Sequence, residues 1–159
     1  MRIDAMTNLA ELLVVAAIVA LGAAPAPAAE PAGYLRDFRR GHAILDTARG
    51  CIYLDIYFAD SPEQRRQGLM RIRELGEFES MIFISNPPIV EVMWMQNTYI
   101  PLDMIYLRDG KVVGITENAQ PLSEDLIRSP GPISAVLEVN GGFAARHRVR
   151  ALDKFALLD

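Results

Sequence analysis

The side chains best suited to chemistry stand in one mostly apolar stretch, Trp94 to Asp103, which reads WMQNTYIPLD. It combines the only tryptophan of the chain with the amide of Asn97, the hydroxyl of Thr98 and the carboxylate of Asp103. An indole ring can stack on a sugar ring, and an amide offers both a donor and an acceptor, so the stretch is a candidate ligand-binding surface. The competing interpretations are that Trp94 anchors the core and that Asn97 and Thr98 hold a turn beside Pro101.

A second candidate is the segment AVLEVN at residues 135–140. By the alternation of a strand, Glu138 and Asn140 share one face, opposite an apolar face. If that face lines a groove, Glu138 and Asp103 could form a carboxylate pair for acid–base work or cation binding, and if it meets solvent, Glu138 is an ordinary surface residue. Asp103 precedes an apolar strand, so we expect it to have an arginine, lysine or backbone partner.

Other kinds of site find little support in the sequence. The only histidines, His42 and His147, are far apart, and a single cysteine, Cys51, excludes an intrachain disulfide and a multi-cysteine zinc site. Cys51 opens an apolar strand and is expected to be buried and inert. Met93 and Met95 share a strand face that could hold Cu(I), but methionines more often fill core gaps. No nucleophile elbow, P-loop or dinucleotide fingerprint is present. We therefore predict no metal and no cofactor.

The N-terminal residues predict export. Leu12–Gly22 is apolar and uncharged, and the following run of alanine and proline fits signal peptidase cleavage. We predict a signal peptide over residues 1–29 and a periplasmic or secreted protein, with a retained membrane anchor as the alternative. Cleavage after residue 28 would leave 15 basic and 18 acidic residues, a net charge of −3, and this near balance predicts no nucleic-acid partner.

The elements that must position these residues are mostly strands. Residues 30–50 form a polar lead-in, and residues 51–159 form a single domain. Ser61, Pro62 and Gln64 predict a capped helix over residues 62–67, which Gly68 ends. Asp109-Gly110 predicts a hairpin turn, residues 118–132 a long loop and residues 143–147 one helical turn. Strands are expected over residues 51–59, 81–85, 90–96, 104–108, 111–116, 133–140 and 154–158. About seven short strands and one short helix favour a mainly β fold, a compact antiparallel sandwich.

Three ordered motifs, spread over most of the region from Ala59 to Phe155, resemble the bacterial and archaeal domain of unknown function 192 family. The motifs are Gly68-Leu69-Met70, the stretch from Trp94 to Asp103, and Val136–Gly142. The resemblance implies a mostly β, jelly-roll-like fold. The chain departs from the family pattern at Gln96, where many relatives have lysine, and at Ser80 and Leu152, where relatives have glycine.

Three functions remain open at this point. The leading one is a non-catalytic binding or accessory module for an envelope glycan or a protein partner. Its groove would be formed by Trp94, Asn97, Thr98, Asp103, Glu138 and Asn140. The second is a hydrolase or lyase acting on an envelope polymer, which needs the carboxyl groups of Asp103 and Glu138 to face one cleft within about 5–10 Å. The third is a structural interaction protein in which Trp94, Asn97 and Glu138 are buried and internally paired. The sequence does not indicate an oligomeric state.

Overall fold

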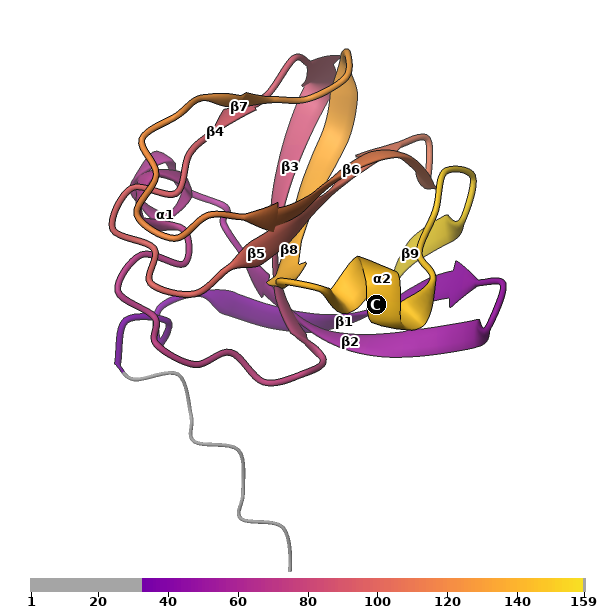
Figure 1. Cartoon of the computed structure of the whole chain (residues 1–159), viewed down its shortest axis with the longest axis horizontal. Coiled ribbons are helices and arrows are strands. Elements are labelled where there is room, and N and C mark those ends of the chain that lie inside the picture. The colour runs from indigo at the N-terminus through magenta and orange to yellow at the C-terminus, as the bar shows by residue number, and fades with distance from the viewer. Residues whose placement is uncertain (1–32, 159) are drawn as a thin grey trace, which may run out of the picture.

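The main sheet of the chain closes on itself as a barrel (Figure 1). The computed structural model describes residues 33–158. The strand order is β1-β2-β3-β8-β5-β6-β9, with β9 pairing with both β6 and β1. β2 and β3 run parallel, whereas the other neighbouring strands run antiparallel. The mainly β prediction is therefore confirmed, but the sandwich or jelly-roll is wrong, because the main sheet of the described residues closes into one seven-stranded barrel.

The barrel strands are β1 (Arg39–Thr47), β2 (Gly50–Phe58), β3 (Glu79–Ile89), β5 (Leu102–Arg108), β6 (Lys111–Ala119), β8 (Ile133–Asn140) and β9 (Lys154–Leu158). A separate two-stranded sheet pairs β4 (Val92–Met93) with β7 (Ile127–Arg128). The helices are α1 (Pro62–Gln67) and α2 (Phe143–His147). In Figure 1, α1 and the small sheet lie together at one side of the barrel, away from α2.

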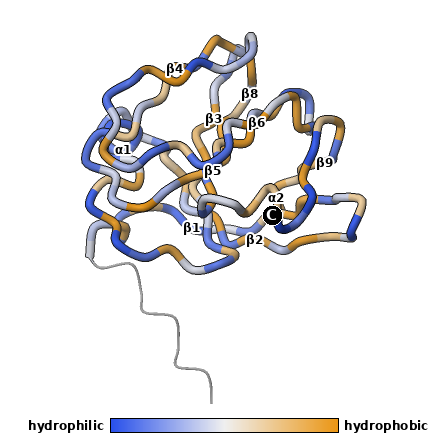
Figure 2. The backbone as a smooth tube through the Cα atoms, viewed as in Figure 1, coloured by the Kyte–Doolittle hydropathy of each residue, from blue (hydrophilic) through white to orange (hydrophobic). Residues whose placement is uncertain are grey.

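The central strands β5 and β8 bury both of their faces, in two separate cores. Alternate residues such as Leu137 and Val139 of β8 belong to the inner core of the barrel, which α2 extends with Phe143 and Ala144. The neighbouring residue, Val136, belongs to an outer core that includes side chains from the segments around α1 and β4. Figure 2 accordingly shows hydrophobic residues concentrated along β3, β5 and β8, whereas α1 is mostly hydrophilic. The outer face of β8 is therefore covered rather than open to solvent.

Several elements predicted from short sequence motifs are confirmed by the structure. Helix α1 has the predicted capping box, in which the Ser61 hydroxyl accepts from the Gln64 amide and the Gln64 side chain accepts from the Ser61 amide. Gly68 ends the helix with a positive φ of 47°. Asp109 and Gly110 form the predicted hairpin turn between β5 and β6.

Other elements differ from the sequence analysis. The segment treated as a lead-in contains β1, whose inward side chains at Ala43 and Thr47 are too small to produce a strong hydrophobic period. Of the strand expected over residues 90–96, only β4 forms. The loop expected over residues 118–132 contains the short strand β7. Cys51 is exposed instead of buried, because it lies on the opposite face of β2 from Leu54 and Ile56.

The described residues contain no helix that is long and apolar enough to span a membrane. The predicted signal peptide, residues 1–29, lies outside the described part of the chain.

Candidate functional site

A pocket of about 220 Å³ lies over the outer face of the barrel between α1 and the β4 segment. We call it the Glu138 pocket, after the residue that β8 contributes to its lining. β3 contributes Phe83, and the β4 segment and the turn after it contribute Trp94 and Thr98. The remaining lining residues are Arg65, Arg66, Gln67, Gly68, Leu69, Met70, Glu91, Val92 and Met93.

Glu138 is a carboxyl group in an apolar setting. Its cross-strand neighbours are Met81 of β3 and Met104 of β5, both fully buried, and Glu138 itself is only 4% exposed. Burial raises the pKa of Glu138 from 4.5 to about 8, because a low-dielectric surrounding disfavours the carboxylate. Within residues 33–158 no hydrogen bond or ion pair to this carboxyl group is found. At neutral pH Glu138 is therefore mainly a neutral acid that lines a pocket with unused hydrogen-bonding capacity.

Arg65 forms a fixed part of the pocket wall. Its guanidinium lies 2.6 Å from the carboxylate of Glu91 and donates to the carbonyl oxygen of Ile84 at 3.0 Å. The hydroxyl of Ser85 makes a short hydrogen bond to the same carboxylate. The charge of Glu91 is thus satisfied inside the wall, and α1 is tied to β3.

Trp94 stands at the mouth of the pocket with 46% of its surface exposed. The interpretation of Trp94 as a core anchor is wrong, because its neighbour Met95 is the residue that is fully buried in the outer core. Trp94 also lines an adjoining hollow of about 560 Å³, which we call the outer hollow, together with Tyr34, Arg71 and Asn97. The exposed indole therefore borders two concave surfaces at once.

Thr98 and Asn97 belong to the turn that carries Trp94 to the pocket. The amide of Thr98 donates to the carbonyl of Met95 at 3.0 Å, and the amide of Arg71 donates to the carbonyl of Asn97 at 2.8 Å. Asn97 has a φ of 57°, a left-handed conformation that asparagine tolerates better than most residues. Thr98 is buried and lines the Glu138 pocket, whereas Asn97 is exposed and lines the outer hollow.

Asp103 does not lie in this pocket. It is the cross-strand partner of Val139, while Glu138 is the partner of Met104, so the two carboxyl groups point to opposite faces of the sheet. Asp103 is fully buried and accepts hydrogen bonds from three backbone amides: those of Asn118 at 2.8 Å, Gly142 at 3.0 Å and Ala144 at 2.8 Å. The structure therefore does not form the predicted acid–base pair, and Asp103 instead holds α2 and the end of β6 against β5.

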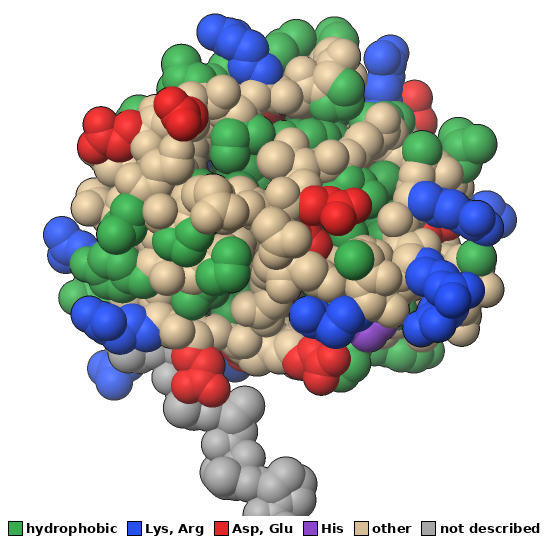
Figure 3. All heavy atoms as spheres, viewed as in Figure 1, with side chains coloured by type: hydrophobic (Ala, Val, Ile, Leu, Met, Phe, Trp, Pro, Cys, Tyr) green, Lys and Arg blue, Asp and Glu red, His purple; other side chains and the backbone are tan. Residues whose placement is uncertain are grey.

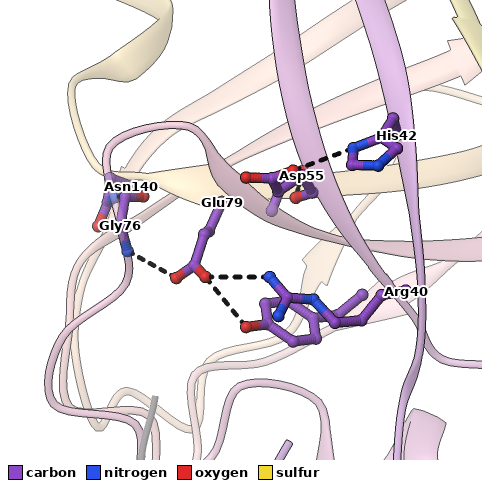
Figure 4. A network of polar contacts seen from close by, with 8 residues as sticks. Arg40, His42, Asp55, Gly76, Glu79 and Asn140 are labelled. Atoms are coloured by element: carbon purple, nitrogen blue, oxygen red, sulfur yellow. Dashed lines mark hydrogen bonds and ion pairs between the residues drawn. The ribbon is translucent and has the colours of Figure 1, made fainter. Parts of the chain in front are cut away.

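Asn140 also lies outside the pocket. Its amide nitrogen donates to the carbonyl oxygens of Leu75 at 3.0 Å and Gly76 at 2.9 Å. Figure 4 shows Asn140 beside Gly76, whose amide donates to Glu79, and Glu79 in turn lies 3.6 Å from the guanidinium of Arg40. Asn140 thus stabilises the connection between α1 and β3.

Most of the pocket wall was not predictable from the sequence. Arg65, Glu91 and Phe83 were not named as site residues, although all three line the pocket. Glu91 is the only charged residue between Ile89 and Met93, and an acid in such a run signals a buried, paired carboxylate. Its partner is 26 positions away in sequence and has no comparable signal.

Solved structures with the same fold come from two bacteria. A Sinorhizobium meliloti protein described as a candidate transcription regulator has 38% identity and a TM-score of 0.73, over 76% of this chain and 95% of that one. A Novosphingobium aromaticivorans protein of unknown function has 37% identity and a TM-score of 0.74, over 84% and 94%. No curated protein matches the chain at a significant level. Residues 44–157 match the model of a family described as an uncharacterized ACR, domain of unknown function 192.

Proposed function

The chain belongs to the domain of unknown function 192 family, and we propose that it is a non-catalytic protein that binds an envelope glycan in the Glu138 pocket. One observation carries the proposal: an exposed tryptophan leads into a pocket that is lined by a buried carboxylic acid with no partner among residues 33–158. A buried polar group normally has its hydrogen bonds satisfied, so an exception at a pocket surface suggests that a ligand supplies the missing partner.

The lining fits a sugar ring. Trp94 offers an aromatic face, while Thr98 and the neutral Glu138 offer hydroxyl donors and acceptors. The volume of about 220 Å³ is below the roughly 300–1,000 Å³ of pockets that hold drug-sized ligands, so it suits about one ring. The outer hollow continues from the same tryptophan and could hold a neighbouring ring. An oligomeric glycan is therefore a better match than an isolated small molecule.

The envelope location rests on the sequence alone. The apolar run over residues 12–22 and the alanine-rich stretch after it support export, and an exported protein meets glycans of the cell envelope. A periplasmic or secreted location is accordingly part of the proposal.

Isothermal titration against a panel of neutral and acidic envelope glycan fragments tests this function. We expect at least one fragment to bind, and Trp94→Ala to weaken that binding at least about fivefold, since stacking adds about 1 kcal/mol beyond the area buried. Tyr53→Ala is the matched control, because Tyr53 is an aromatic side chain on β2 that is 67% exposed and lines neither the pocket nor the hollow. Failure of the whole panel to bind a folded wild-type protein would contradict the proposal.

A hydrolase or lyase is the second candidate, because a carboxyl group protonated at neutral pH is what a general acid requires. Glu138 has that property, but Asp103 on the opposite face cannot serve as its partner. Glu91, the other carboxylate of the pocket, is already bonded to Arg65. We therefore expect bound fragments to be recovered intact, and mass spectrometry after long incubation would reveal any cleavage.

The purely structural alternative fits the molecule less well. It required Trp94, Asn97 and Glu138 to be buried with their polar atoms paired, whereas Trp94 and Asn97 are exposed. A protein partner that covers Trp94 remains an alternative occupant of the same face, and a pull-down with wild-type protein and Trp94→Ala would detect it.

The description of the Sinorhizobium meliloti protein does not lead us to propose DNA binding here. The chain has a net charge of −4, and Figure 3 shows hydrophobic side chains among charged groups of both signs on the face seen in Figure 1. A DNA-binding surface is expected to be strongly basic.

A further inference from the structure

We infer that the Glu138 pocket selects glycans whose rings carry a carboxylate, such as uronic acids, and that the carboxylic acid of Glu138 donates a hydrogen bond to the carboxylate of the ligand. The inference rests on the proposed function and names the ligand class of the same site. It follows from the balance of donors and acceptors in the pocket wall.

Donors outnumber free acceptors in this pocket. Arg65 and Arg66 can only donate, although Arg65 is already bonded to Glu91 and Ile84. The amide nitrogen of Gln67 donates one hydrogen to the carbonyl of Tyr34 at 2.6 Å and keeps a second one, and the hydroxyl of Thr98 donates to the carbonyl of Gln96 over a long 3.5 Å. Arg66 lies on the exposed side of α1, where its ion pair with Glu63 is long at 3.4 Å. Exposed pairs of this kind are weak, so Arg66 is available to a ligand.

The one ionised acid of the wall, Glu91, cannot serve as an acceptor for the ligand. Its carboxylate is bonded by Arg65 at 2.6 Å and by the hydroxyl of Ser85, and its side chain is largely buried. The pocket therefore lacks a free negative charge that would repel an anion. An acceptor-rich ligand group complements it better than an additional donor does.

Glu138 is suited to be a donor rather than an ion. It lies between two buried methionines, and no cation pairs with it among the described residues. The charged groups that share its pocket are Arg65 and Arg66 of α1 and Glu91 beside β4. On β5, Tyr106 also interacts with Glu138, but its hydroxyl is bonded to Thr116 at 2.9 Å, and its pKa is raised by burial and by the charge of Glu138.

In the described part of the chain, the remaining elements around the carboxyl group add no titratable side chain. β3 contributes Met81 and Phe83, and residues 94–98 contain no acid, base or tyrosine. The protonation of Glu138 itself therefore governs how the pocket responds to pH between 6 and 10. Arginine does not titrate in this range.

A cationic ligand would show the opposite behaviour. An ammonium group would need ionised Glu138, so its affinity would rise as pH passes about 8, and Glu138→Gln would abolish binding. A carboxylate ligand needs the protonated acid, so its affinity should be flat below pH 8 and fall above it. The sign of the pH dependence separates the two classes.

The test compares a galacturonate trimer with the same trimer after chemical reduction of its carboxylates to alcohols. Rings and linkages are identical, so only the carboxylate differs. With the full-length protein at pH 7, we expect the acidic trimer to bind at least about tenfold more tightly, the range of a charge-assisted hydrogen bond. Glu138→Ala should weaken binding of the acidic trimer and leave the reduced trimer less affected.

Glu138→Gln provides the decisive pH profile, because its amide donates at every pH. We expect wild-type affinity for the acidic trimer to fall about fivefold between pH 8 and pH 9, whereas the variant shows no such fall and binds more tightly than wild type at pH 9. Glu117→Gln is the matched control, since Glu117 is exposed on β6 and lines neither the pocket nor the hollow, and it should keep the wild-type profile.

Several outcomes overturn the inference. Equal or tighter binding of the reduced trimer does so while leaving the proposed glycan function in place. Affinity that rises above pH 8 and is abolished by Glu138→Gln would indicate a cationic ligand. If neither trimer binds while a neutral fragment of the panel does, only the inference fails, and if no fragment binds, both proposals fail.

Discussion

At the scale of single residues, two buried acids that are close in the sheet have different roles because of what surrounds them. Asp103 is surrounded by three backbone donors, whereas Glu138 is surrounded by apolar side chains and an open pocket. The same residue class is therefore a structural cap in one position and a candidate ligand contact in the other.

Glu138 should make the stability of the protein fall as pH rises. Its pKa is about 8 when folded and near 4.5 when unfolded, so the folded state retains a proton that the unfolded state has lost between these values. The contribution of protonated Glu138 to the stability of the fold is therefore fully present below pH 4.5 and is lost as the pH rises to about 8. Relative to wild type, the free energy of unfolding of Glu138→Gln should be up to about 4 kcal/mol higher at pH 8 and almost unchanged at pH 4.5. Urea unfolding at several pH values measures this difference, and a difference independent of pH would contradict it.

Asp103→Asn should destabilise the fold rather than alter binding. The amide has one acceptor oxygen where the carboxylate has two, so at least one of the three backbone donors loses its partner. We expect the free energy of unfolding to fall by about 2–4 kcal/mol. Asp109→Asn, at an exposed turn, is the control and should be nearly neutral. An equally small effect at Asp103 would show that these hydrogen bonds contribute little.

Glu138 and Trp94 could be selected as candidate site residues from the sequence, but their place in the pocket could not be told apart from the structural place of Asp103. The donors to Asp103 come from Asn118, Gly142 and Ala144, which no local pattern connects to β5. Strand alternation alone does not show whether the outer face of β8 meets solvent. That face is covered by the segments around α1 and β4, which are distant in sequence.

At the scale of elements, α1 is short and depends on its ends. Its capping box was predictable because Ser61, Pro62 and Gln64 interact within one turn. The helix carries no buried residue, so its position depends on the cap and on the hydrogen bonds of Arg65, Gln64 and Gln67 to neighbouring segments.

Ser61→Ala should cost about 1 kcal/mol of stability, because the Gln64 amide loses the hydroxyl that accepts its hydrogen bond at 3.2 Å. Affinity for any glycan ligand should fall with it, since α1 presents Arg65 and Arg66 to the pocket. Thermal unfolding and isothermal titration measure the two effects. Ser61→Asp retains a capping oxygen and should restore both, and failure of that rescue would argue against the cap as the cause.

At the scale of the whole molecule, the closure of the barrel was not predictable from local signals. β9 near the C-terminus pairs with β1 near the start of the described chain, from His42 opposite Leu158 to Asp46 opposite Lys154. A sandwich and a barrel share the same short alternating strands, and they differ in such long-range pairs.

The seam between β6 and β9 should open first. Their register includes one pair, Lys111 with Lys154, and the residues of β9 are mostly exposed. β8 is paired on both sides and largely buried. Hydrogen exchange followed by mass spectrometry should therefore show β9 amides exchanging well before those of β8. Equal protection in the two strands would contradict this order.

The central claim, that the Glu138 pocket binds an envelope glycan, is tested most directly by the fluorescence of Trp94. As the only tryptophan of the chain, it reports on the pocket mouth without interference from another indole. We predict a saturable change in emission as acidic glycan fragments are added, with a weaker response in Glu138→Ala. Emission that stays constant across all fragments, in a protein that unfolds cooperatively, would contradict the account.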